Sequence, residues 1–386
     1  SKIRVLTVFG TRPEAIKMAP VVHELAARAD TFDARVCVTS QHKEMLQQVL
    51  DVFEIEPDFD LDVMKPDQDL FDITEGVLRR IKHVLRRWRP DVALVHGDTT
   101  TTFAASLASF YEGVPVGHVE AGLRTRDKRQ PFPEEINRRL ADMVCDLHFA
   151  PTAVNERNLR GDGIPPDGIV VTGNTVVDAL LGVVPKARAL DPRIPGLEGV
   201  DWGLQTILVT CHRRESFGSQ LEGIFRALRT IVERHSGVNV VYPVHRNPNV
   251  LGPATELLGG RERIHLIEPL DYLPFVWLMD RCHLVLTDSG GIQEEAPSLD
   301  KPVIVMRNKT ERAEAVETGA VILAGTDGAR IVEEVTRLVT DQEAHERMAR
   351  ADNPYGDVRA SQRIADAIVR HLAGRLARRV APAPLP

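Results

Sequence analysis

The sequence predicts an α/β protein with two Rossmann-like domains. Short β-branched runs alternate with longer amphipathic stretches along nearly the whole chain, which is the rhythm of βαβ units and a parallel sheet. With 386 residues, the chain exceeds the size that one hydrophobic core usually supports. A segment rich in proline and glycine at 185–202 separates two such series and predicts a surface connection. Length alone would also allow one large barrel.

The first series begins with a strand at 3–8 and a helix at 13–28. Further strands are expected at 34–38, 92–96, 116–119 and 147–150, and helices at 41–53, 71–88 and 100–111. The second series supplies strands at 206–210, 238–244, 264–267, 284–287 and 303–305. A last helix is expected at 359–378, followed by a disordered Pro-rich tail.

These series predict three segments. Residues 1–178 form an N-terminal Rossmann-like domain, and 179–356 form a C-terminal one. We expect the helix within 357–386 to pack back on the N-terminal domain. Two α/β domains joined by a linker would place a ligand cleft between the carboxyl ends of their strands.

Composition excludes several classes of function. The net charge of −7 gives no broad basic surface, so nucleic acid is not the expected partner. The four cysteines are far apart and form no C-x-x-C pair, which predicts neither a disulfide framework nor a zinc site and favours the cytoplasm. No apolar stretch approaches the roughly 18 residues of a membrane span, so no membrane association is expected.

The turn after the first strand carries Arg12 at the expected start of a helix, between Gly10 and Pro13. A guanidinium beside free backbone N–H groups suits an anion such as a diphosphate, although a solvated arginine in a turn would leave the same pattern. Neither G-x-G-x-x-G nor G-x-x-x-x-G-K-[ST] occurs, which disfavours NAD and ATP.

Three carboxylates follow at the ends of strands or the start of a helix, namely Asp98, Glu120 and Glu134. Together they suggest acid/base chemistry. Asp98 could instead cap the next helix, and either Glu134 or its neighbour Glu135 could be an ordinary first-turn acid. His118 and Glu120 match the H-x-E of zinc deaminases, but no P-C-x-x-C follows, so no metal is expected.

In the second series, His212 and Arg213 follow one strand and His245 follows the next. For His245 alone, a capping or solvated role explains the position equally well. Ser289, Gly290 and Gly291 precede an expected helix whose N–H groups could hold a phosphate. A glycine-rich turn with a serine cap is the alternative.

Read together, these segments resemble the non-hydrolysing UDP-N-acetylglucosamine (UDP-GlcNAc) 2-epimerase family, which has the two-domain GT-B arrangement with its active site in the interdomain cleft. The matching motifs are FGTRPEAIK at 9–17, HGDTTT at 96–101, HVEAGLR at 118–124, PEEINR at 133–138, TGNT at 172–175, HRRE at 212–215 and TDSGGIQEE at 287–295.

The resemblance assigns a role to each matching residue. Catalytic positions fall on Asp98, Glu120, Glu134 and His212. UDP-sugar positions fall on Arg12, Lys17, Phe275, Ser289, Gly290, Gly291, Glu295 and Arg312. A second, activating UDP-GlcNAc would contact Gln41, His42, Glu44, Arg213 and His245. Asp67 departs from the pattern, because some activated members carry arginine there.

The implied reaction is reversible epimerisation at C2 of UDP-GlcNAc to the N-acetylmannosamine isomer, UDP-ManNAc, in a homodimer that needs no cofactor. A hydrolysing epimerase and a GT-B glycosyltransferase could use the same nucleotide cleft. A non-catalytic UDP-sugar sensor could keep the phosphate site but would not need the three acids.

Overall fold

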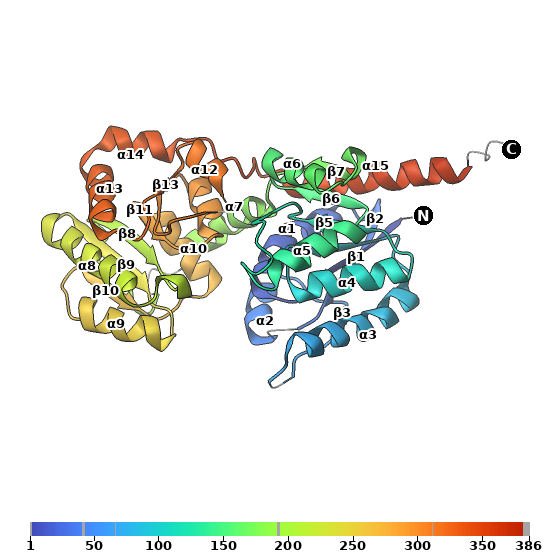
Figure 1. The fold of residues 1–386 in the computed structure, drawn as a ribbon, viewed down its shortest axis with the longest axis horizontal. Coiled ribbons are helices and arrows are strands. Elements are labelled where there is room, and N and C mark those ends of the chain that lie inside the picture. Colours follow the sequence, from blue (N-terminus) through green and yellow to red (C-terminus); the bar gives the residue numbers. More distant parts are fainter. Residues whose placement is uncertain (1, 41–42, 66, 191–193, 311, 381–386) are drawn as a thin grey trace. The chain divides into compact units, whose positions relative to one another are not determined.

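The computed structural model describes residues 2–40, 43–65, 67–190, 194–310 and 312–380. The chain forms two compact units, one made of Ser1–Ala179 with Tyr355–Pro386 and the other of Leu180–Pro354. Each unit is a parallel sheet with alternating helices (Figure 1). The prediction of two Rossmann-like α/β domains is confirmed.

The first unit contains a seven-stranded sheet in the order β3-β2-β1-β4-β5-β6-β7, and every pairing in it is parallel. Its strands are β1 (Ile3–Phe9), β2 (Phe32–Val38), β3 (Phe59–Asp60), β4 (Val92–His96), β5 (Val116–Val119), β6 (Leu147–Ala150) and β7 (Ile169–Val171). The central strands β4, β5 and β6 are buried at every position. Continuous burial explains their apolar, β-branched runs.

The helices of this unit are α1 (Arg12–Ala27), α2 (Lys43–Val52), α3 (Leu70–Trp88), α4 (Thr100–Tyr111), α5 (Glu134–Val144), α6 (Ala153–Gly161), the start of α7 (Thr175–Arg188) and α15 (Ala360–Val380), with a short 3-10 turn at Pro166–Gly168. The apolar face of α3 packs with α4 on β1 and β4. The last helix, α15, returns to this unit, where Ser361 Oγ donates to Asp178 Oδ1 at 2.7 Å and Ile364 and Ile368 are fully buried.

The second unit contains a six-stranded parallel sheet in the order β10-β9-β8-β11-β12-β13. Its strands are β8 (Gln205–Thr210), β9 (Val238–Pro243), β10 (Ile264–Ile267), β11 (Leu284–Thr287), β12 (Val303–Val305) and β13 (Val321–Leu323). Its helices are α8 (Ser219–Arg234), α9 (Pro248–Leu258), α10 (Tyr272–Arg281), α11 (Ile292–Glu295), α12 (Ala313–Glu317), α13 (Gly328–Thr340) and α14 (Gln342–Ala349), with 3-10 turns at Arg214–Ser216 and Ala296–Leu299.

The expected surface connection begins later than the sequence indicated. Pro185 lies inside α7, which continues to Arg188, and the boundary between the units falls within this helix. Pro185 therefore does not start the loop. Among the described residues, no helix combines the length and the apolar character needed to cross a bilayer.

Candidate functional site

The carboxyl ends of β1, β4 and β5 meet at one edge of the first sheet, because these strands are parallel neighbours. The turn at Gly10 follows β1, the turn at Gly97 follows β4, and Glu120 follows β5 directly. His96 is in register with Val119 across the β4–β5 pair. Two of the three candidate carboxylates therefore leave adjacent strands at the same edge.

Asp98 does not cap the helix that follows it. The cap of α4 is Thr99, whose side chain accepts a hydrogen bond from the Thr102 amide. The Asp98 carboxylate instead pairs with Arg138 of α5, and Asn137 Nδ2 donates to the Asp98 carbonyl at 3.1 Å. These contacts fix both the backbone and the side chain of Asp98 at the sheet edge.

Glu120 combines unusual backbone geometry with a polar surrounding. Its φ of 63° lies in the left-handed region, which non-glycine residues adopt rarely and often at functional sites. Its carboxylate pairs with Lys17 of α1 and accepts from Asn174 Nδ2 at 2.9 Å. His96 Nε2 lies 3.8 Å from the same carboxylate oxygen. Lys17, predicted to contact the UDP-sugar, is thus also a partner of a candidate acid.

The two glutamates that open α5 have different surroundings. Glu135 is fully buried and accepts from the amides of Thr125 and Arg126 at 3.0 and 3.2 Å. It is a structural residue of the loop before α5. Glu134 is partly exposed at the first position of the helix, one turn before Arg138, which holds Asp98. Of this pair, only Glu134 is available for chemistry.

The backbone amides beside Arg12 are not free, in contrast to the sequence-based expectation. The carboxylate of Glu14 accepts from the Gly10 amide at 3.0 Å and the Thr11 amide at 2.8 Å. Thr99 Oγ1 donates to the other oxygen of Glu14 at 2.7 Å. Burial raises the pKa of Glu14, although these hydrogen bonds oppose the shift. These amides are therefore occupied, and Arg12 at the start of α1 stays the predicted anion-binding group of this turn.

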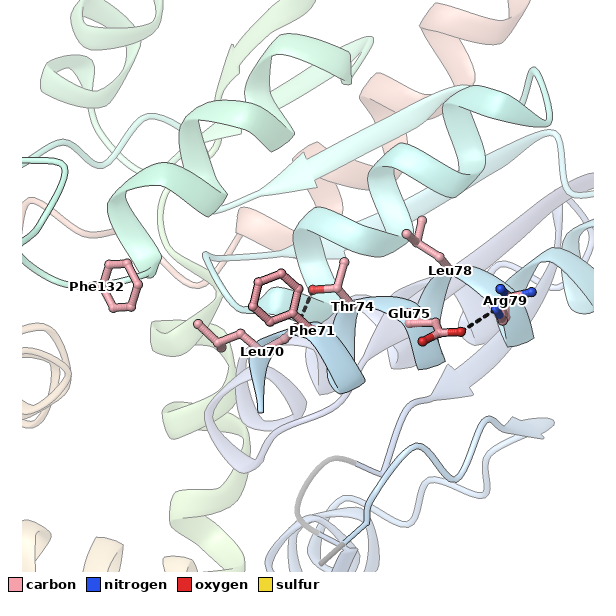
Figure 2. Close-up of a pocket in the computed structure, with 7 residues that line it drawn as sticks. All are labelled: Leu70, Phe71, Thr74, Glu75, Leu78, Arg79 and Phe132. Carbon is pink, nitrogen blue, oxygen red and sulfur yellow. Dashed lines mark hydrogen bonds and ion pairs between the residues drawn. The ribbon is translucent and has the colours of Figure 1, made fainter. Parts of the chain in front are cut away.

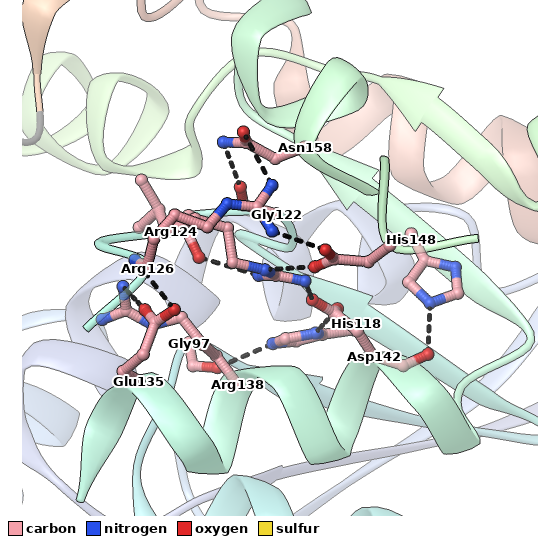
Figure 3. Close-up of polar contacts among 12 residues, drawn as sticks. Gly97, His118, Gly122, Arg124, Arg126, Glu135, Arg138, Asp142, His148 and Asn158 are labelled. Atoms are coloured by element: carbon pink, nitrogen blue, oxygen red, sulfur yellow. Dashed lines mark hydrogen bonds and ion pairs between the residues drawn. The ribbon is translucent and has the colours of Figure 1, made fainter. Parts of the chain in front are cut away.

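Figure 3 shows a network of polar contacts around His118, Arg124 and Asp142, whose side chains are buried. His118 Nδ1 lies 2.6 Å from Asp142 Oδ1, and His118 Nε2 lies 2.7 Å from the Gly97 carbonyl. Arg124 donates to Asp142 at 2.6 Å and to Asp162 at 2.7 Å. Burial opposes ionisation of Asp142, but His118 and Arg124 outweigh it and lower the pKa of this carboxyl. Each nitrogen of the His118 ring thus faces an acceptor oxygen, so both contacts hold the orientation of the ring.

In the second unit, Asp288 fixes the loop that carries His212. This fully buried carboxylate accepts from the amides of His212 and Arg213, both at 2.7 Å, and its other oxygen lies 3.4 Å from His212 Nδ1. The His212 ring stacks on His245, with ring centroids 5.4 Å apart and an interplanar angle of 14°. The predicted catalytic and activator histidines are therefore direct neighbours.

The turn Ser289–Gly291 differs from the expected phosphate-binding helix start. The helix that follows, α11, has only four residues, and its cap is Gly291 rather than Ser289. Arg312 supplies positive charge at this turn: its guanidinium lies against Gly290, and its Nε donates to the buried Glu294 at 2.7 Å. Phe275 lies partly exposed on α10 and Glu295 at the end of α11.

We expect Gly290→Ala to weaken UDP binding about 10-fold, because a Cβ atom would lie 2.6 Å from Arg312 Nη1 and force the guanidinium away from the turn. Gly252→Ala on α9 is the matched control, since an added Cβ there would meet nothing within 4 Å. Titration calorimetry with UDP measures both variants. Equal affinities in the two would show that Arg312 does not shape the turn for the nucleotide.

The predicted activator residues are divided between the units. Gln41 and His42 lie outside the described residues. Glu44 is in the first turn of α2, whereas Arg213 and His245 follow strands of the second unit. Their joint role in binding a second UDP-GlcNAc stays a prediction.

Comparison with known proteins assigns the family. The model of the UDP-N-acetylglucosamine 2-epimerase family matches residues 23–369. The chain belongs to this family. It is 57% identical over 376 residues to the UDP-N-acetylglucosamine 2-epimerase of Yersinia pestis, covering 96% of this chain and 99% of that protein. The Escherichia coli K12 enzyme of the same name is 54% identical over 370 residues, with 95% and 98% covered.

A solved structure agrees with this assignment. The UDP-GlcNAc 2-epimerase of Neisseria meningitidis, bound to UDP-GlcNAc, superposes with a TM-score of 0.87 at 48% identity, covering 95% of this chain and all of that chain. The recognition of an epimerase family from the sequence motifs is confirmed.

Several residues of the site were not singled out from the sequence. Arg138 and Asn174 lie inside the matching motifs, but their roles as partners of the acids depend on which strands are neighbours. Glu14 had a local signal, because Thr11 and Glu14 form the T-x-x-E pattern of a capping box. Asp288 lies inside the motif at 287–295, but its role as the acceptor for the loop of His212 depends on β8 and β11 being neighbours. The pairing of His118 with Asp142 crosses 24 residues and leaves no local sequence signal.

Proposed function

We propose that this epimerase interconverts UDP-GlcNAc and UDP-ManNAc without net hydrolysis. A carboxylate removes the C2 proton while the bond between C1 and the diphosphate oxygen breaks. The electron pair of this C1–O bond leaves with UDP. The product of this step is 2-acetamidoglucal. UDP then adds back to C1, and a proton is returned to the opposite face of C2.

The arrangement of the acids in the first unit is the observation that carries this proposal. Removal and return of a proton on two faces need two proton-handling groups. Asp98 and Glu120 follow neighbouring strands, and Glu134 begins the helix whose Arg138 holds Asp98. None of the three is accounted for as a helix cap or as a buried structural acid.

The second unit supports departure of the diphosphate. We assign UDP to the turn Ser289–Gly291 with Arg312, and stabilisation of the leaving-group charge to His212, together with Arg12 of the first unit. The backbone of His212 is fixed by two hydrogen bonds to Asp288. Preorganised donors of this kind stabilise developing negative charge without reorganising during the reaction.

The test is incubation with UDP-GlcNAc in D2O, without added nucleotide cofactor or metal. We expect UDP-ManNAc with deuterium at C2, detected by NMR and mass spectrometry. Epimerisation without deuterium uptake would contradict proton transfer. Stoichiometric free ManNAc would identify a hydrolysing enzyme, activity only with an added acceptor would identify a glycosyltransferase, and UDP-GlcNAc binding without turnover would identify a sensor.

We also propose that two copies of the chain associate through an apolar groove on the first unit (Figure 2). Leu70 and Phe71 of α3 line it with Phe132, and the two phenylalanines are 84% and 68% exposed. Exposed apolar patches of this kind mark interaction sites. Glu75 and Arg79 place opposite charges on the same surface, which suits a two-fold interface between identical copies.

Sedimentation equilibrium tests this assembly. We expect a dimer for the native chain and a monomer for Phe71→Glu, because a carboxylate at the centre of the groove opposes burial. The matched control, Phe110→Glu, changes another exposed phenylalanine outside the groove lining. A native monomer, or a Phe71→Glu dimer of native affinity, would exclude this interface.

The four free thiols fit a reducing compartment, and we infer a cytoplasmic enzyme.

A further inference from the structure

His96 is a buried polar side chain that the proposed chemistry does not yet use. It is the last residue of β4 and is 3% exposed. Neither ring nitrogen has a hydrogen-bond partner among the described residues. Buried polar groups are nearly always hydrogen-bonded, and exceptions often have a catalytic role.

The direction of the His96 ring indicates what its missing partner is. Its Nε2 atom lies 3.8 Å from Glu120 Oε2, which is beyond hydrogen-bond length but within reach of a small shift. Hydrogen bonds of catalytic groups are often long in free enzymes and shorten when substrate binds. The same carboxylate already meets Lys17 from α1 and Asn174 from the turn before α7.

The charge state of His96 suits a donor to a carboxylate. Burial lowers the pKa of His96 to about 4, with Glu120 and Asp98 opposing and Lys17 and His118 reinforcing the shift. These four groups come from α1, from β5 and its end, and from the loop after β4. The ring is therefore neutral near pH 7, with one N–H to donate. Because Nε2 faces an acceptor, we assign the proton to Nε2.

We propose that His96 is a positioning residue that acts through Glu120, donating from Nε2 to its carboxylate as the substrate complex forms. This bond fixes the orientation of the carboxylate, whose backbone is already in the left-handed region at φ 63°. It also favours the ionised form of Glu120, because a hydrogen bond to a carboxylate stabilises the charged state. The inference rests on the proposed function, in which Glu120 handles a C2 proton.

Three substitutions separate this role from simple packing. Glutamine can place an amide donor near the position of Nε2, asparagine reaches only the position of Nδ1, and phenylalanine keeps the ring shape without a donor. We expect kcat to fall about 10- to 100-fold in His96→Asn and His96→Phe, because a misplaced catalytic group costs this much. The kcat of His96→Gln should stay within about 5-fold of that of the native enzyme. The KM for UDP-GlcNAc should change little in all three.

The pH profile supplies a measurement that would not change if His96 served only to pack the core. The acid limb of kcat/KM should shift to higher pH in His96→Phe and His96→Asn but not in His96→Gln. Equal losses in His96→Gln and His96→Phe would show a structural role. A raised KM with native kcat would show that His96 contacts the substrate instead. Either result would overturn the proposal.

A measurement on the native chain keeps the inference testable if a variant does not fold. Nitrogen-15 NMR of the histidine rings should show His96 neutral and protonated at Nε2 between pH 5.5 and 8, and an imidazolium or an Nδ1–H tautomer would overturn the proposal. The native enzyme is first assayed for C2 deuterium exchange. Absence of exchange would refute the proposed function itself, whereas exchange with the wrong variant pattern would refute only the role of His96.

Discussion

Glu120→Gln is expected to lower kcat by about 100- to 10,000-fold, because an amide cannot accept the C2 proton that a positioned carboxylate accepts. The substitution preserves the shape of the side chain and the acceptor oxygen for Lys17 and Asn174. UDP affinity should stay within about 3-fold of the native value, since the assigned nucleotide groups other than Arg12 and Lys17 lie on the second unit. Asp98→Asn and Glu134→Gln should behave in the same way.

Steady-state rates and calorimetry with UDP measure these two effects separately. The neighbouring pair on α5 provides a control: Glu135→Gln should lower the thermal midpoint with a much smaller effect on kcat, because Glu135 holds the amides of Thr125 and Arg126. Glu134→Gln should instead lower kcat strongly and change the thermal midpoint little. Native rates in all three acid variants would remove the carboxylates from the mechanism.

The sequence predicted the central strands well because these strands are buried on both faces and read as continuous apolar runs. The edge strands β3 and β7 escaped prediction for the opposite reason. β3 has two residues, and β7 has three that are all at least partly exposed. Hydrophobic pattern carries little information at such short, exposed edges.

Residues at the ends of strands were predictable because parallel strands gather their carboxyl ends at one edge. The contacts that these residues make were not predicted from the sequence. Glu14 occupies the amides expected to be free beside Arg12, and Asp98 pairs with Arg138 instead of capping the next helix. The first contact is local, because Thr11 and Glu14 form a capping box of the T-x-x-E type at the start of α1. The second joins residues 40 positions apart and depends on β4 and β5 being neighbours.

Asp142→Asn is the substitution with the largest expected effect on stability. Asp142 is 1% exposed and lies between the side chains of His118 and Arg124, each 2.6 Å away. An asparagine would lose the negative charge and turn one N–H toward a donor. Removing one partner from a buried ionic group costs about 3–5 kcal/mol, because the remaining charges cannot be solvated.

Asp162→Asn is the matched control, because Asp162 also pairs with Arg124 but has a side chain that is 15% exposed. We expect it to cost only about 1 kcal/mol, since water reaches its surroundings and Arg124 keeps Asp142. Chemical unfolding monitored by circular dichroism measures both variants. Equal losses in the free energy of unfolding would mean that the deeper burial of Asp142 adds nothing to its contribution.

Asp142→Asn should also affect the edge of the first sheet that carries Asp98 and Glu120. His118 holds the Gly97 carbonyl at 2.7 Å, next to Asp98, and stands two residues before Glu120. In Asp142→Asn, the amide keeps only one acceptor oxygen between His118 and Arg124, so the His118 ring can lose the partner that orients it toward the Gly97 carbonyl. At temperatures where Asp142→Asn is still folded, kcat should therefore fall while UDP binding is kept, which assays on the folded fraction would measure.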